Sequence, residues 1–537
     1  MKVQSRSVED HSEPRPLTLV PLWFVFYFAT GELQSESVLK THRSHTFLNL
    51  VALLAVIGPV HHARGQSPSM QSPAPVASAE PPSVRRLLQS LQTKPGGLTP
   101  DRVAESVVRV SPDLEARREE VLAAAAAVDQ ARIAFIPKLT VGGLVGVASE
   151  IPATDYGNVV VAPDSPVGPL SPGAPLVNAP FSIPAAPTHR YAAQASLNIP
   201  LSDYLLRTRQ ALSGAEDNQA SAEVTRKAST LSAAVEARVL YYNWVRAKLQ
   251  LTVAEQTLHQ SQDHLRDVNN SFEAGQASRA DVLSSESQLA RSELLLERAK
   301  NLVAFSEQQL RIAMHDASGA PYAVGENVFT ADAAPPQGQA LEALQLEAVQ
   351  ARLEPRALQQ SSDALKEQAK VASAGVFPRL DGVASVLYAN PNTNIVPLRD
   401  GFKTTWLVGV QATWEVNGLG DAAAARRGFE ARAAETEARR GATEDAIRTE
   451  VSQFWQALQD ARAAVQSTAR SLAASEEAYR VRRELFQNGR ASNVELEDAE
   501  TDLTSSRFGV VDAQIDLRIA SLRLAHATGR DVIGSGN

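Results

Sequence analysis

The stretches FEAGQASRADVLSSESQL (residues 272–289) and FQNGRASNVELEDAETDL (residues 486–503) share one pattern. In both, an aromatic residue is followed by a glycine and then by a serine at the same spacing. These positions are Phe272, Gly275 and Ser278 in the first copy and Phe486, Gly489 and Ser492 in the second. Glycine suits the left-handed turn that ends a helix, and serine caps the start of the next one. Each stretch therefore predicts a helix–turn–helix tip, and the chain is expected to be internally duplicated.

The duplication extends beyond the tips. AFIPKL (134–139) matches GVFPRL (375–380), and each is expected to end a helix and start a strand. Alternation of apolar and polar residues predicts four strands, at about 139–149, 191–201, 380–388 and 404–416. Residues 150–190 carry nine prolines and are expected to form an irregular loop. Each copy thus reads as helix, strand, loop, strand, long helix, tip and helix.

The long helices carry apolar residues at seven-residue spacing, which predicts coiled-coil pairing. In the first copy these residues are Trp244, Leu251, Leu258, Leu265 and Phe272 before the tip, and Val282, Leu289, Leu296, Val303 and Leu310 after it. In the second copy they are Leu458, Val465, Leu472, Tyr479 and Phe486, then Leu496, Leu503, Val510, Leu517 and Leu524. Because the two helices of each copy meet at a tip, we expect two antiparallel hairpins.

The N-terminal part has the composition of an export signal. Residues 47–60 form an apolar segment, and Ala63 and Gly65 place small residues before Gln66, so cleavage is expected between Gly65 and Gln66. The expected divisions are an N-terminal extension with signal peptide (1–65), a Pro/Ser-rich arm (66–98), a first structural repeat (99–320), a linker (321–340), a second structural repeat (341–530) and a tail (531–537).

Composition excludes several kinds of protein. The chain has no cysteine, so disulfides, thiolate metal sites, a catalytic cysteine and an acylated N-terminal cysteine are not expected. The formal charge is -8 without a basic block, so no nucleic-acid partner is expected. We find no Gly-x-Ser-x-Gly or phosphate-loop motif. His259 and His264 lie five residues apart and are interpreted as solvated surface histidines. No catalytic residue, metal or cofactor is predicted.

The strands have the pattern of a membrane β-barrel. Trp406 and Trp414 share one face of the last strand, about 26 Å apart at ~3.3 Å per residue, and Tyr191 lies on an apolar strand face. Aromatic residues at this separation fit the two rims of an apolar band. The alternative, a soluble sheet, needs helices to cover its apolar face, and the heptads already occupy them. Four strands cannot close a barrel, so several chains must pool their strands.

The motif G-x-x-S/T-x-x-D/E-V/L after each tip, within this duplicated architecture, resembles TolC-like outer-membrane efflux proteins over residues 99–528. The resemblance implies a mainly α fold with a membrane β-barrel. Three chains would pool four strands each into a twelve-stranded barrel, and their hairpins would form a periplasmic α-barrel. It also implies a homotrimer in outer-membrane lipid. The expected partners are a periplasmic adaptor protein and an inner-membrane transporter of the RND, ABC or MFS type.

By this resemblance, the expected function is an exit duct that passes small molecules from the periplasm to the exterior. The outlet of a type I protein secretion system is an alternative. A periplasmic coiled-coil adaptor is a rival of another class, but an adaptor would carry one hairpin and not two.

The tips are the candidate functional site. Asp281 and Glu495 follow the capping serines by three residues, so capping boxes can explain both acids. Asp498 and Asp502 continue a stripe with Glu495 at i, i+3, i+7 spacing, for which a solvated helix face is the alternative.

By the resemblance, acids at Glu495 and Asp498 line the closed entrance, attract cations and raise each other's pKa. The turn residues of both tips are the expected adaptor contacts. The family's tyrosine and arginine latch is replaced here by Phe486 and Ala491. Arg490 is expected to pair with Asp281 instead, while Phe486 only packs.

Overall fold

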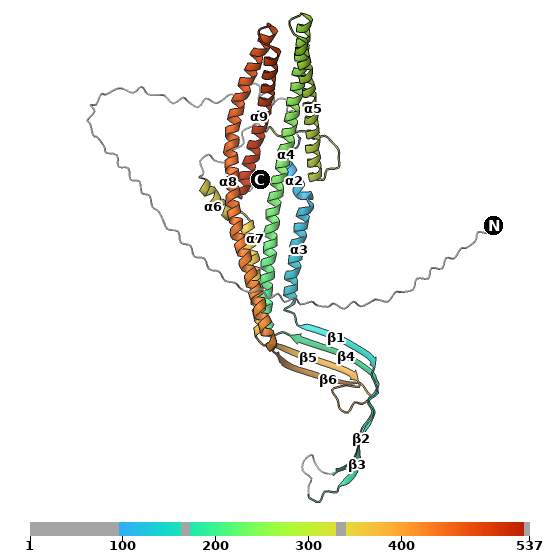
Figure 1. Ribbon diagram of the computed structural model, residues 1–537. Helices are drawn as coiled ribbons and strands as arrows, with labels where there is room; N and C mark the ends of the chain where they lie inside the picture. The colour runs from blue at the N-terminus through green and yellow to red at the C-terminus, as the bar shows by residue number, and fades with distance from the viewer. Residues whose placement is uncertain (1–95, 163–171, 329–339, 531–537) are drawn as a thin grey trace, which may run out of the picture. The chain divides into compact units, whose positions relative to one another are not determined.

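The computed structural model describes residues 96–162, 172–328 and 340–530 (Figure 1). The expected signal segment and its cleavage point, the arm up to residue 95, residues 329–339 of the expected linker and the whole tail (531–537) lie outside the described residues.

The order of elements follows the predicted duplication. The helices are α2 (Pro100–Val110), α3 (Pro112–Ile133), α4 (Arg209–Glu273), α5 (Arg279–Met314), α6 (Leu341–Ala351), α7 (Glu354–Ser373), α8 (Leu419–Gln487) and α9 (Asn493–Ala527). The strands are β1 (Lys138–Val147), β2 (Thr154–Val161), β3 (Val177–Ile183), β4 (His189–Ile199), β5 (Arg379–Asn390) and β6 (Lys403–Thr413).

Strands β1, β4, β5 and β6 form one antiparallel sheet in that order. The register places Val141 opposite Ala195, Ala195 opposite Val386, and Val386 opposite Trp406. Residues directly opposite one another share a face, so these four lie in one row. Val141 is 75% exposed and Trp406 74%, so this apolar face is uncovered in a single chain.

The segment 150–190 is not the irregular loop that its prolines predict. It contains the two-stranded sheet of β2 and β3, and the ring of Tyr156 lies 5.7 Å from that of Phe181. Pro180 lies inside β3, opposite Asn158. Proline is tolerated there because both strands of a two-stranded sheet are edge strands, which can lose an N–H on their open side.

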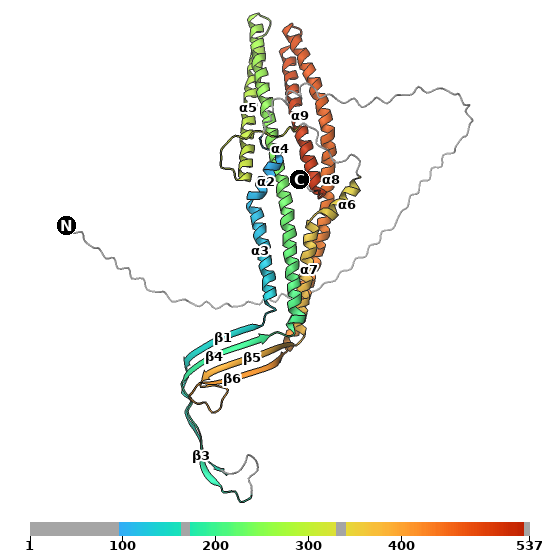
Figure 2. The same ribbon diagram turned by 180° about the vertical axis from the view of Figure 1, so that it is seen from behind.

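The hairpins α4–α5 and α8–α9 lie beside each other, as both views show (Figures 1 and 2). Helix α8 has 69 residues, which corresponds to a length of about 100 Å at ~1.5 Å per residue. Within the second hairpin the predicted heptad residues Leu458, Leu472 and Leu503 are fully buried. Pairing of this length fits the coiled-coil prediction.

In α4 the predicted heptad residue Trp244 is fully buried, but nearer the tip the buried seam differs from the predicted one. Leu251, Leu258 and Leu265 are only half-buried, and Phe272 is 42% exposed. The residues buried instead in this half of the helix also follow three- and four-residue spacing; they are Ala254, Thr257, Ser261, His264 and Val268. The reason is that α4 packs against α9 as well as α5, and the face between its two partners carries small and polar side chains.

Polar side chains join α4 to α9 along this seam. Gln250 Nε2 donates to Asp512 Oδ1 at 2.8 Å, and Arg246 forms an ion pair with Asp516. Nearer the tip, the hydroxyls of Thr257 and Thr504 are 3.3 Å apart. These bonds run antiparallel along the two helices and fix the register of one hairpin against the other.

The sheet is joined to the helices at the start of the second repeat's first strand. Ser202 N donates to Leu380 O at 3.1 Å, and Leu380 N donates back to Ser202 Oγ at 3.0 Å. Arg379 forms an ion pair with Asp203, with 3.4 Å between Nε and Oδ2. Among the described residues, none of the helices combines the length and the apolarity that crossing a bilayer requires.

The core between the hairpins gives a stability prediction. Ile515 is fully buried in the cluster that joins α4 and α9. Ile515→Ala should lower the free energy of unfolding by about 2–5 kcal/mol, because it leaves a cavity, whereas Ile515→Val should cost about 0.5–1.5 kcal/mol. Denaturant unfolding of the purified protein in detergent, followed by circular dichroism, measures both. Equal stability of the two variants would contradict the packing.

Candidate functional site at the hairpin tips

The two tips have the same backbone geometry. Gly275 and Gly489 adopt positive φ angles of 69° and 67°. Gln276 N donates to Ser271 O at 2.8 Å, and Arg490 N donates to Leu485 O at the same distance. A left-handed residue after a helix favours glycine, which explains why glycine occupies this place in both copies.

Capping boxes start both outgoing helices. Ser278 N donates to Asp281 Oδ2 at 2.8 Å, and Ser492 N donates to Glu495 Oε2 at 2.9 Å. The serine hydroxyls accept from the backbone N–H of the same acids, at 3.2 and 3.3 Å. Capping is therefore one role of Asp281 and of Glu495.

The capping bonds lower the pKa of both acids. For Asp281, the hydrogen bonds from the Ser278 hydroxyl and backbone N–H lower the carboxyl pKa. For Glu495, the backbone N–H and hydroxyl of Ser492 lower the pKa, and Arg482 adds to this effect. Hydrogen bonds to the charged form favour it. Within one chain, the expected mutual repulsion does not dominate at Glu495.

The acidic stripe lines a groove of about 390 Å³ between α8 and α9. Arg482 of α8 forms an ion pair with Glu495 at 2.7 Å. Asp498 and Asp502 are exposed and make no hydrogen bond or ion pair with the described residues of this chain. The remaining lining is Ala474, Ser475, Ala478 and Ala499, whose small side chains leave the acids open to the groove.

In the first hairpin, a position that matches the acidic stripe contacts the second hairpin. Ser284 corresponds to Asp498, but its hydroxyl donates to Glu497 Oε2 at 2.8 Å. Ser285 donates to Glu497 Oε1 at 3.2 Å. This face of the first hairpin therefore contacts the second hairpin, so the two tips are alike in backbone and different in side-chain environment.

The expected pair of Arg490 with Asp281 is not formed within one chain. The Asp281 carboxylate is bonded to Ser278, and no ion pair joins Arg490 to it among the described residues. Phe486 packs as anticipated, its ring stacked 5.7 Å from that of His264. The arginine that reaches an acid of the stripe is Arg482, which sequence reasoning missed because its partner lies 13 residues away across the turn.

The interpretation of the two histidines as solvated holds for one of them. The side chain of His259 is 75% exposed, beside Asp263. For His264 the interpretation is wrong, because its side chain is only 3% exposed and its ring contacts Glu500 and Asn493 of α9. The missed signal is the three- and four-residue spacing that His264 shares with Thr257, Ser261 and Val268. No cluster of metal-binding side chains occurs in the described part of the chain.

The three predicted girdle aromatics differ in their surroundings. Trp406 is 74% exposed on the apolar face of β6. Trp414 follows the end of β6 and donates its indole N–H to Val376 O at 3.3 Å. Tyr191 lies near the other end of the sheet, and its ring is 6.2 Å from that of Phe402.

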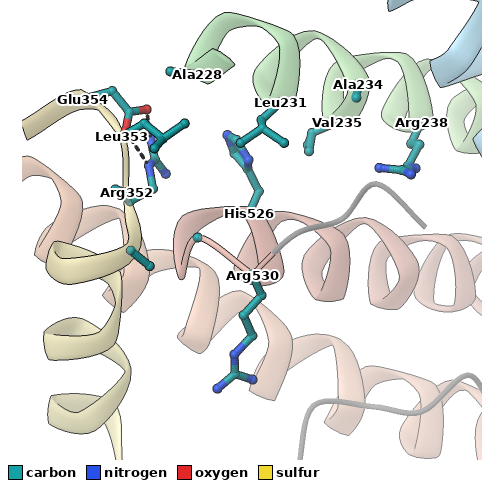
Figure 3. A pocket seen from close by; sticks show the side chains of 12 residues that line it. Ala228, Leu231, Ala234, Val235, Arg238, Arg352, Leu353, Glu354, His526 and Arg530 are labelled. Atoms are coloured by element: carbon teal, nitrogen blue, oxygen red, sulfur yellow. Dashed lines mark hydrogen bonds and ion pairs between the residues drawn. The ribbon is translucent and has the colours of Figure 1, made fainter. Parts of the chain in front are cut away.

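A small cavity lies where the end of α9 meets α4 and the α6–α7 junction (Figure 3). Its volume is about 30 Å³, and His526 points toward Leu231 across it. Each of its three arginines has an acidic partner: Arg352 bonds Glu354, Arg530 bonds Glu347, and Arg238 bonds Asp101. Burial and the charge of Arg352 lower the pKa of His526. We interpret this cavity as structural.

Comparisons with known proteins agree with this architecture. Residues 104–314 and 346–530 match the family described as outer membrane efflux protein. No curated protein matches the sequence significantly. Among solved structures, CusC is 16% identical with a TM-score of 0.65, over 86% of this chain and 99% of that chain. The outer-membrane channel OprN is 17% identical with a TM-score of 0.65, over 86% and 98%.

The CmeC outer membrane channel of Campylobacter jejuni is 13% identical with a TM-score of 0.65, over 86% of this chain and 91% of that chain. At these identities the likeness shows the fold. The predicted fold class, mainly α with long hairpins and membrane β-strands, is confirmed.

The capping box of the second tip can be tested by local proteolysis. Ser492→Ala removes the cap of α9 and should destabilise its first turn by about 1 kcal/mol. Tryptic cleavage after Arg490 should then become about five-fold faster in limited digestion of the folded protein. Ser278→Ala is the matched control, because it frays the first tip and should leave the rate after Arg490 unchanged. Equal acceleration by both variants would show a global effect.

Proposed function

Because this chain belongs to the outer membrane efflux protein family and is a channel protein of the outer membrane, we propose that it is the exit duct of a tripartite efflux pump. In this role it passes small molecules from the periplasm to the exterior. The type I secretion outlet is the alternative within the same family. The channels of this family are transport ducts and have no enzymatic activity.

The observation that carries the proposal is the sheet with two open edges. In the described part of the chain, β1 pairs only with β4, and β6 pairs only with β5. An open edge with an exposed apolar face cannot remain in lipid, because unpaired backbone groups there cost several kcal/mol each. Pairing of β6 with β1 of the next copy would satisfy both edges. Three chains would then give the twelve strands expected of a closed barrel.

The first hairpin offers further support for association of copies. Helix α5 carries a row of large apolar side chains that no other described element covers; these are Leu283, Leu294, Leu302, Phe305 and Ile312, each at least 43% exposed. Exposed apolar surface of this extent is typical of an interaction site. We assign it to contact between neighbouring hairpins of a homotrimer.

In the assembled duct, both tips would face the periplasm and meet a periplasmic adaptor, which connects to an inner-membrane transporter. The turn residues around Gly275 and Gly489 are exposed and suit this contact. The segment that contains β2 and β3 would lie on the extracellular side. The rival role of a periplasmic adaptor is disfavoured by the open-edged sheet, which needs lipid and neighbouring strands.

The proposal predicts a stable trimer that conducts ions. Native mass measurement of the detergent-purified protein should give three chains, and planar bilayers should show channels. Membrane fractions should retain the protein after a carbonate wash, because strands paired in lipid are not extracted with soluble proteins. A monomer that carbonate releases would refute the duct and favour the adaptor role.

We further propose that Glu495, Asp498 and Asp502 bind cations at the entrance. Glu495→Ala with Asp498→Ala should weaken block of the channel by multivalent cations at least ten-fold, because three chains would lose six carboxylates. The matched control is Glu286→Ala with Glu293→Ala, which removes the same charge from exposed positions of α5. Unchanged block in the first variant, measured as conductance in planar bilayers, would mean that the stripe does not face the pore.

A further inference from the structure

His264 lies at the centre of a buried contact between the two hairpins. Its Nδ1 is 3.1 Å from Glu500 Oε1, and its Nε2 is 2.7 Å from Asn493 Oδ1. His264, Asn493 and Glu500 are each at most 6% exposed. On α4 the histidine belongs to the first hairpin, whereas both partners belong to α9 of the second.

The contacts require a proton on each ring nitrogen. A carboxylate oxygen only accepts, so His264 Nδ1 must donate to Glu500. The Asn493 amide is oriented by its NH₂ group, which donates to Glu497 Oε1 at 2.7 Å and to Asp281 O at 3.3 Å. Its oxygen therefore faces the ring and accepts from Nε2. An imidazole with two donated bonds is the cationic form.

The carboxylate of Glu500 depends on this cation. Its second oxygen, Oε2, is buried and has no hydrogen-bond partner among the described residues. A buried carboxylate without a compensating charge is strongly unfavourable. A neutral His264 would keep at most one of its two bonds and would leave Glu500 without its counter-charge.

Other charged groups surround the contact from each neighbouring helix. From α9, Glu497 adds negative charge close to the ring. The remaining groups are already engaged: Arg483 of α8 with Asp267, Arg507 of α9 with Gln260, and Asp263 of α4 with Arg266. Tyr479 of α8 is neutral, since burial raises its pKa. From α5, the hydroxyl of Ser285 donates a hydrogen bond to Asn493 Oδ1. His264 contacts Glu500 directly, at 3.1 Å, and is placed to balance its charge.

We propose that protonated His264, bound to Glu500 and Asn493, is a proton-dependent clasp that holds the first hairpin to the second near the tips. Loss of one ring proton opens the clasp and lets the outgoing helix α9 separate from α4. Phe486, stacked on the histidine ring, would move with it. The clasp is a property of one chain. Its consequence, a wider periplasmic entrance at higher pH, rests on the proposed duct.

The direction of the pH effect follows from the surroundings of the ring. Burial opposes the charge on His264, but the hydrogen bond and negative charge of Glu500 outweigh it, so the pKa of His264 is raised. A raised pKa means that the clasp is fully formed below the ordinary histidine value of about 6.5 and is lost as the pH rises through the folded pKa. Acid therefore closes the clasp and alkali releases it.

Hydrogen–deuterium exchange of the purified full-length trimer tests the clasp directly. Protection of peptides covering residues 261–268 and 493–503, corrected for intrinsic exchange, should fall at least ten-fold between pH 5.5 and 8.5. His264→Gln should show the low protection at every pH, because glutamine does not gain a charge. Glu500→Gln should move the midpoint to lower pH, since it removes the charge that raises the pKa of His264.

His259→Gln is the matched control, because His259 lies on the same helix but is exposed, and it should keep the wild-type profile. A pH-independent wild type, or an unchanged pH profile in His264→Gln, overturns the clasp. Conductance of the same proteins in planar bilayers separates the two proposals. Absence of any channel contradicts the duct whatever the exchange result, whereas channels combined with a flat exchange profile contradict the clasp alone.

Discussion

In its half toward the tip, helix α4 packs against two partners at once, and the arrangement of the hairpins depends on this double contact. With α5 it forms the first hairpin, and with α9 it joins that hairpin to the second. The seam consists of Ala254, Thr257, Ser261, His264 and Val268, mostly small or polar side chains, so the helices approach closely and can hydrogen-bond across the contact. Most buried polar groups in proteins are hydrogen-bonded, because an unpaired one is costly to bury. Each bond therefore also specifies which register the two hairpins adopt.

Much of the fold could be predicted because its elements are long and periodic. The heptads indicated the hairpins, and the capping serines indicated where α5 and α9 begin. The seam of α4 could not be found in this way, because apolar spacing reveals only apolar contacts. Alignment of the repeats also misleads here: Glu286 matches Glu500, yet Glu286 is exposed and Glu500 buried. Glu500 faces α4 and bonds His264, whereas Glu286 lies on an exposed face of α5, so equivalent positions have different neighbours.

In the sheets, too, the sequence pattern predicted some strands and not others. Period-two alternation predicted β1, β4, β5 and β6 because one face of each is apolar and uncovered. The ribbon of β2 and β3 was hidden by its prolines, which exclude a central strand but not an edge strand. At the tips, the acids were found from spacing, whereas Arg482 and His264 required the third dimension, since both act on residues of another helix.

The small residues of the α4 seam set a limit on how this sequence can drift. At Ala254 and Ser261 a larger side chain would push α9 or α5 away, so few replacements are compatible with the fold. The half-buried leucines at 251, 258 and 265 can exchange with other apolar residues of similar volume at little cost. In sequences that descend from this chain, substitutions should therefore be more frequent at these three leucines than at Ala254 and Ser261.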